Sequence, residues 1–210
     1  MHINNIVAKA LQRSSTLFRG FASRNLLLMR KSFITYIRPI LEYNSILWSP
    51  NLVYLIDLIE SAQRKFTKRI SSISSLPYSS RLDILNMQPL ELRRLHLDLI
   101  NYYKILNDLS PLNATEYFLI YSPITSTRSN IPSLLKPLHS SRKFSASFFY
   151  RSVDAWNHLP SNIKLLTSLY SFKLALKLVD LSAFLKCSFF FHNQLICFYC
   201  SFYYVVFIYI

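Results

Sequence analysis

The chain of 210 residues contains a single glycine, Gly20, and this scarcity constrains the fold more than any other feature. Glycine normally makes up about 7% of a protein, and it supplies the left-handed backbone conformations that tight turns and helix caps need. A chain with almost none is poorly suited to a fold rich in β-hairpins. We therefore expect an all-α protein, in which helices are joined by loops of serine, proline and asparagine. A codon usage biased toward A and T would also lower the glycine content, and it needs no structural cause.

The positions of the apolar residues predict where the helices lie. Apolar side chains recur every three or four residues from Ile3 to Leu11, which predicts an amphipathic helix near the start of the chain. Ser23 is expected to cap a second helix, and Asn113 a short one that contains Glu116. The same periodicity predicts longer helices at about 52–70 and 90–109, and further helices that begin near 78, 148 and 168.

The segment Tyr36–Pro50 is apolar enough for a core, yet it contains two residues of opposite charge. Arg38 and Glu42 are four positions apart, and a helix would place them on one face as a structural ion pair. Pro39 lacks a backbone N–H, so we expect a kink or a break beside this pair. The proline at the end of the segment is expected to terminate it.

Changes in composition divide the chain. Residues 122–143 are rich in Ser, Thr, Pro and basic residues, which is typical of a loop. From Cys187 onward there is no Lys, Arg, Asp or Glu, and Phe, Tyr, Val and Ile dominate. The predicted organisation is a helical bundle at 1–75, a helical continuation at 76–121, a basic Ser/Thr/Pro loop at 122–143, C-terminal helices at 144–186, and an uncharged aromatic tail at 187–210.

The chain has 24 basic and 10 acidic residues, a net charge of +14. An excess of this size indicates a polyanionic partner or an anionic membrane surface, although a basic surface with no special partner is an alternative. The excess is spread along the chain up to Lys186 and is not gathered in one tail, which favours nucleic acid. No small-molecule substrate is indicated, and the sequence leaves the oligomeric state open.

Six sequence runs occur in an order and spacing that resemble a known family. They are RPILEY at 38–43, IESAQRKFTKRI at 59–70, LPYSSRL at 76–82, LELRR at 90–94, FFYRSVDAWNHLP at 148–160 and SLYSFK at 168–173. This order is similar to the region downstream of the polymerase palm in jockey-like, LINE-type non-LTR retrotransposon reverse transcriptases, over about residues 2–180. The resemblance implies a thumb-like helical bundle at 1–75 that lies along the template–primer duplex.

By this resemblance, basic residues of the chain would contact the phosphates of a nucleic acid without reading its sequence. The residues expected to do so are Arg64, Lys65, Lys68 and Arg69, with Arg93 and Arg94 as second choices. The composition of the basic loop adds further candidates, because no acidic residue in that span faces Arg128, Lys136, Arg142 and Lys143; a loop that is merely solvated is the alternative. An alternative applies to the helix at 52–70. Its acidic residues come first and its basic residues last, an order that also offsets the helix dipole.

The sequence lacks the catalytic part of such an enzyme. A reverse transcriptase holds two metal ions with clustered carboxylates, and in this family an aromatic-x-Asp-Asp turn supplies two of them. No two acidic residues are adjacent in this chain. We therefore expect no polymerase activity from the chain alone, no catalytic or metal-binding residues and no cofactor. The Mg²⁺ of the parent polymerase would belong to the missing palm.

Two other hypotheses stay open: a host-adopted helical protein-interaction module, and a membrane-anchored protein that uses residues 187–210. The apolar run at the end of the chain is shorter than the roughly 20 residues that a spanning helix needs, so a membrane partner is not favoured. We interpret the tail as out-of-frame translation. Cys197 and Cys200 have a metal-like spacing without turn-forming neighbours, and a zinc site is not expected. Three cysteines predict no disulfide framework, and an intracellular protein, nuclear or cytoplasmic, is expected.

Overall fold

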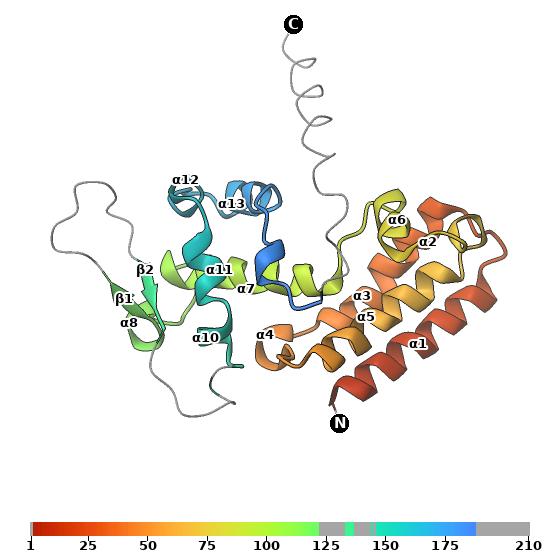
Figure 1. The fold of residues 1–210 in the computed structure, drawn as a ribbon, viewed down its shortest axis with the longest axis horizontal. Helices are drawn as coiled ribbons and strands as arrows, with labels where there is room; N and C mark the ends of the chain where they lie inside the picture. The colour runs from red at the N-terminus through yellow and green to blue at the C-terminus, as the bar shows by residue number, and fades with distance from the viewer. Residues whose placement is uncertain (1, 122–132, 137–143, 145, 188–210) are drawn as a thin grey trace, which may run out of the picture.

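The computed structural model describes residues 2–121, 133–136, 144 and 146–187, and these residues are mostly helical (Figure 1). The prediction of an all-α protein is therefore confirmed. The helices are α1 (His2–Gly20), α2 (Leu26–Ser32), α3 (Arg38–Glu42), α4 (Ser45–Trp48), α5 (Val53–Lys68), α6 (Tyr78–Ile84), α7 (Leu90–Leu106), α8 (Ala114–Tyr117), α10 (Phe148–Arg151), α11 (Val153–His158), α12 (Ser161–Lys164) and α13 (Leu169–Leu176). The structure also has a π-helical turn (Phe33–Ile37) and two 3₁₀ turns (Ser71–Ile73 and Ser182–Phe184).

The helices from α1 to α6 pack around a first hydrophobic core. Helix α1 buries Val7, Ala10 and Phe18 on one face, as its apolar periodicity predicts. Phe66 of α5 lies at the centre of this core, with its ring centroid 5.0 Å from those of both Phe18 and Phe33. The aromatic contacts hold α1, α5 and the π-helical turn together as one bundle.

Helix α7 connects this bundle to a second hydrophobic core. Its first residue, Leu90, belongs to the first core, and its later residues from Leu92 onward belong to the second. Tyr102 and Tyr103 of α7 are fully buried there among residues of α10, α11 and α13. The first core thus continues past the expected boundary at residue 75 as far as Leu90.

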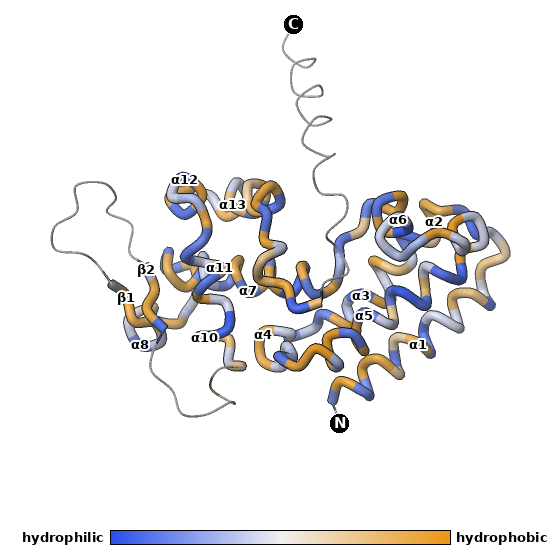
Figure 2. Tube along the Cα trace, viewed as in Figure 1, coloured by the Kyte–Doolittle hydropathy of each residue, from blue (hydrophilic) through white to orange (hydrophobic). Residues whose placement is uncertain are grey.

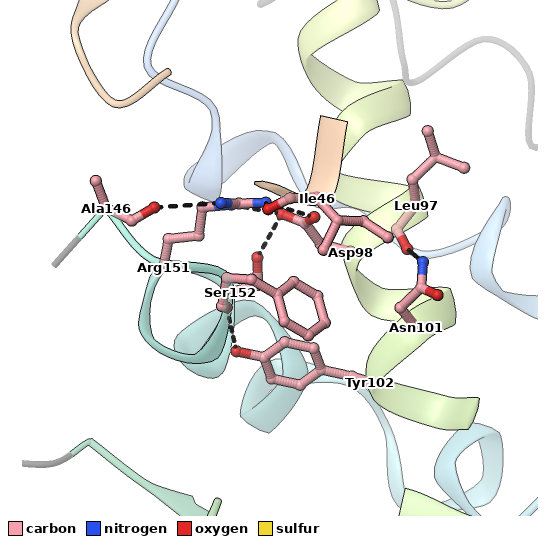
Figure 3. Close-up of polar contacts among 9 residues, drawn as sticks. Ile46, Leu97, Asp98, Asn101, Tyr102, Ala146, Arg151 and Ser152 are labelled. Carbon is pink, nitrogen blue, oxygen red and sulfur yellow. Dashed lines mark hydrogen bonds and ion pairs between the residues drawn. The ribbon is translucent and has the colours of Figure 1, made fainter. Parts of the chain in front are cut away.

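Arg151, at the end of α10, ties the second region to α4 and α7 (Figure 3). Its guanidinium donates two hydrogen bonds to the Asp98 carboxylate, each of 2.8 Å, and one of 2.9 Å to the carbonyl oxygen of Ile46. Ser152 also donates to Asp98, at 3.0 Å. Asp98 is 3% exposed, so Arg151 compensates a charge that is almost out of contact with water.

The structure corrects or refines the sequence predictions at three places in the first bundle. The expected ion pair of Arg38 with Glu42 was wrong, because Glu42 accepts two hydrogen bonds from Arg93 of α7 instead. The helix cap predicted at Ser23 lies two residues later: Asn25 accepts a 2.8 Å hydrogen bond from the N–H of Leu27. The break expected near the proline takes the form of the π-helical turn, which ends just before α3.

A small β-sheet was not predicted. Strand β1 (Leu119–Tyr121) pairs antiparallel with β2 (Ser133–Leu135), so structure extends into the expected loop at 122–143. The side chain of Asn157 fixes β2 on α11, because it accepts from the N–H of Leu134 at 3.0 Å and donates to its carbonyl at 2.8 Å. The predicted cap at Asn113 is confirmed, since it accepts a 3.1 Å hydrogen bond from the N–H of Thr115.

The expectations for residues 188–210, including those for Cys197 and Cys200, fall outside the described residues. Within the part of the chain that the structure describes, no helix combines the length and the apolar character needed to cross a membrane.

Candidate nucleic-acid interface

Helices α1 and α5 lie side by side (Figure 1). Basic residues gather at one end of the seam where they meet. A shallow depression of about 390 Å³ separates their outer surfaces. Its lining comprises Leu11, Ser14 and Ser15 of α1, with Lys65 and Lys68 at the end of α5 and Arg69 just after it. Three cations and hydroxyl groups therefore surround one concave surface, which is a suitable arrangement for an anion.

Arg69 is held at this seam by two contacts with α1. Its guanidinium carbon lies 4.1 Å from the centroid of the Phe18 ring, and its Nη1 donates a 3.4 Å hydrogen bond to the Ser15 hydroxyl. A guanidinium has five N–H donors, and the hydrogen bond to Ser15 uses one of them. The residue remains exposed, as Lys65 and Lys68 do.

The interior of the bundle positions the basic end of α5. Arg81 of α6 is buried and donates to the carbonyl oxygen of Arg64 and to the hydroxyl of Thr67, both at 3.0 Å. On the same side, Gln63 donates to the Tyr78 hydroxyl at 3.1 Å. These contacts fix the last two turns of α5, so its lysines extend from a rigid support.

Arg64 is already engaged within the protein. It forms a 2.8 Å ion pair with Asp57, which lies two turns earlier on α5. Its guanidinium also lies 5.4 Å from the ring centroid of Tyr78. Both partners of the ion pair are partly exposed, so the pair is screened by water and contributes little to stability. The proximity of Asp57 nevertheless reduces the positive potential at this position, which makes Arg64 a weaker candidate than its neighbours.

The two second-choice residues are less exposed than the basic residues at the end of α5. Arg93 is bound to Glu42, as described above. Arg94 is only 2% exposed, and burial lowers its pKa while the nearby carboxylates of Glu60 and Glu91 raise it. We therefore remove Arg94 from the candidate surface, since a phosphate on the surface cannot reach a buried guanidinium. Arg93 is partly exposed, but its charge is already compensated by Glu42, so it is a weaker candidate than the exposed residues of the seam.

Glu60 is the main buried anion beside Arg94. Its carboxylate accepts a 3.0 Å hydrogen bond from the N–H of Leu90 and another from the Tyr78 hydroxyl. Burial raises the pKa of Glu60, whereas the hydrogen bond from Tyr78 and the charge of Arg94 lower it. This polar group joins α5, α6 and α7, so its role is structural.

Two basic residues of α1 were missed from the sequence. Lys9 and Arg13 are exposed, and with Gln12 and Thr16 of α1 and Ile40 of α3 they line a second depression where α1 meets α3. Their spacing of four residues, opposite to the buried face of α1, is the signal that would have found them. Together with the seam they extend the basic surface across the outside of α1.

The remaining candidates lie elsewhere. Arg128, Arg142 and Lys143 fall outside the described residues. Lys136, which follows β2, forms an ion pair with Asp154 and lies 5.0 Å from the ring centroid of Tyr150. Among the residues that the structure describes, no group of three or more His, Cys, Asp or Glu side chains is arranged to hold a metal ion.

Comparison with known proteins finds a relative of this chain that matches part of its length. No family model and no solved structure matches the chain. A protein of Caenorhabditis elegans, described as uncharacterized, is 28% identical over 109 residues, which are 50% of this chain and 55% of that protein. The chain therefore matches about half the length of this relative, whose description states no activity.

Proposed function

We propose that the chain is a fragment of a non-LTR retrotransposon reverse transcriptase that binds a nucleic-acid duplex without sequence preference. The six ordered sequence runs that resemble the jockey-like family support this origin. The observation that carries the binding proposal is the seam of α1 and α5, where Lys65, Lys68 and Arg69 border a depression that Leu11, Ser14 and Ser15 complete. Lys9 and Arg13 extend this surface.

In this proposal the cations contact phosphates of the duplex backbone and displace its condensed counterions. Arg69, which is stacked on Phe18, would give a hydrogen bond of fixed direction, and the two lysines would act as mobile point charges. None of these contacts involves a base edge, so the binding has no sequence preference. A nuclear or cytoplasmic location follows from a nucleic-acid partner and from the absence of a disulfide framework in the sequence.

The proposed fragment does not polymerise by itself. Two metal ions must be held about 3.5–4 Å apart by clustered carboxylates, and the ten acidic residues of the chain include no adjacent pair. The Mg²⁺ ions and the catalytic aspartates belong to the palm of the parent enzyme in this proposal. The chain would contribute only binding of the duplex.

Salt dependence tests the proposal. We would measure the affinity for a fluorescent RNA–DNA hybrid duplex by anisotropy between 50 and 200 mM KCl. Five phosphate contacts predict a slope of log K against log salt of about −4.5, a loss of affinity of roughly 500-fold over this range. The double variant Lys65→Gln with Lys68→Gln removes two of these contacts, so its slope should be shallower by about 1.8.

The matched control is Lys173→Gln with Lys177→Gln, which removes the same charge from exposed residues of the second region. This variant should keep the slope of the wild-type chain. An equal change in both double variants would mean that net charge, and not the seam, governs binding. A duplex affinity that does not respond to salt would exclude the proposed mode altogether.

A further inference from the structure

The outer face of α13 carries a row of exposed apolar side chains. Tyr170, Leu174 and Leu178 are 70%, 45% and 69% exposed, although each is a large hydrophobic residue. They are four positions apart, and Leu178 lies in the turn that follows α13, where its N–H donates to the carbonyl of Ala175 at 3.0 Å. A spacing of four residues produces one continuous ridge along a helix surface.

A row of lysines runs beside this ridge. Lys173 and Lys177 are both exposed and are also four positions apart. On the helix they precede Leu174 and Leu178 by one position, so the cationic row is parallel to the apolar one. The sequence from 155 to 179 contains no acidic residue, so the charges on α13 itself are positive, and the exposed Asp180 follows two residues after Leu178.

The opposite face of α13 is firmly held. Phe172 and Leu176 are buried in the second core, and the Phe172 ring stacks on Tyr103 with centroids 4.2 Å apart. The Tyr103 hydroxyl in turn donates to the carbonyl of Leu166, in the segment that leads into α13. The exposed face is thus presented by a fixed helix at the outer edge of the second region (Figure 2).

We propose that this face binds an acidic amphipathic helix of a partner protein. Such a helix would pack its own apolar row against the ridge of Tyr170, Leu174 and Leu178, in the way that helix surfaces interdigitate. Glu or Asp residues beside that row would pair with Lys173 and Lys177, as charged residues flank the apolar seam of a coiled coil. The parallel rows match this partner in both shape and charge.

Other occupants fit less well. A second copy of the chain would place lysines against lysines in a symmetric contact. A nucleic acid would satisfy the lysines but would leave three apolar side chains against a hydrated phosphate backbone. An anionic bilayer would accept both rows, but an interfacial helix usually inserts a longer apolar face than these three residues provide.

A designed peptide tests the proposal directly. The probe is a fluorescent helix of about three heptads with leucine at positions a and d and glutamate at e and g, and its partner probe has lysine in place of every glutamate. The full chain should bind the glutamate peptide and not the lysine peptide. The double variant Lys173→Glu with Lys177→Glu should bind the glutamate peptide about tenfold more weakly and should bind the lysine peptide instead.

The control carries the same charge reversal at two exposed residues of the first region that lie outside both depressions, as Arg19→Glu with Lys31→Glu, and should leave both affinities unchanged. The variant Leu174→Ser should weaken the glutamate peptide with an unaltered unfolding midpoint, since this side chain lies at the surface. The proposal is overturned if neither peptide binds, or if the control variant weakens binding as strongly. It is also overturned if the chain binds phosphatidylserine vesicles through Leu174 in preference to the glutamate peptide.

Discussion

The substitution Arg151→Met would test how much one buried ion pair stabilises the second region and its contact with α4. It keeps most of the aliphatic stem but removes four hydrogen bonds: two to Asp98 and one each to the carbonyls of Ala146 and Ile46. Asp98 stays 3% exposed and keeps the hydrogen bond from Ser152 as its compensation. Removing one partner of a buried ion pair typically costs about 3–5 kcal/mol, and we expect a loss of this size at pH 7.

The loss should depend on pH in a defined direction. Burial raises the pKa of Asp98, whereas the hydrogen bonds and charge of Arg151 lower it. Without Arg151 the pKa therefore rises further above that of the unfolded chain. Between the two pKa values the native state holds a proton that the unfolded state has lost, so the free energy of unfolding falls as pH rises. The variant should accordingly lose more stability at pH 7 than at pH 4.

Urea unfolding followed by tryptophan fluorescence provides the measurement. Trp48 packs against the first core and Trp156 lies in the second, so the single-tryptophan backgrounds Trp48→Phe and Trp156→Phe report on each region. The double variant Asp98→Asn with Arg151→Met removes the isolated charge and should recover part of the loss. A cost below about 1 kcal/mol, or one that is equal at both pH values, would refute the view that Arg151 neutralises a buried anion.

Three further predictions concern stability. Phe66→Ala should lower the free energy of unfolding in urea by about 3–5 kcal/mol, because it opens a cavity between Phe18 and Phe33. A loss under about 1 kcal/mol would show that neighbouring side chains move in and fill the cavity. Burial lowers the pKa of His96 to about 4. As pH falls from 6.5 to 4, the unfolded chain binds a proton at this residue before the native state does, so the stability of the wild-type chain should fall. The variant His96→Leu should show a flatter dependence of stability on pH. An unchanged profile would contradict a buried neutral imidazole. Asn25→Ala should lower stability by about 1 kcal/mol through loss of the cap on α2, and circular dichroism melts of this variant and of Ser23→Ala would separate the two residues.

Local patterns in the sequence predicted the helices well and their partners poorly. The apolar stripes of α1 and α5 follow from a period near 3.6, so their position and buried faces could be derived from neighbouring residues alone. Glu42 shows the opposite case. Its spacing to Arg38 indicated a local pair, but the arginine that binds it is 51 positions away, and no local rule contains that contact.

The candidate surface was partly predictable for the same reason. Lys65, Lys68 and Arg69 form a visible basic run, and the structure leaves them exposed. Arg94 looks similar in sequence, yet it is buried beside carboxylates supplied by α5 and α7. The strands β1 and β2 have three residues each, which is too short for a period of two to be recognised.

The position of Glu91 has a consequence for synthesis of the chain on the ribosome. This carboxylate at the start of α7 is nearly buried, and it accepts hydrogen bonds from the backbone N–H groups of Lys186, at 2.8 Å, and Cys187, at 3.1 Å. Those donors emerge from the ribosome 95 and 96 residues after their acceptor. While only the segment up to α7 has left the ribosome, the Glu91 carboxylate must stay hydrated, because its native donors have not yet been synthesised. Its native hydrogen bonds can form only after Lys186 and Cys187 have emerged.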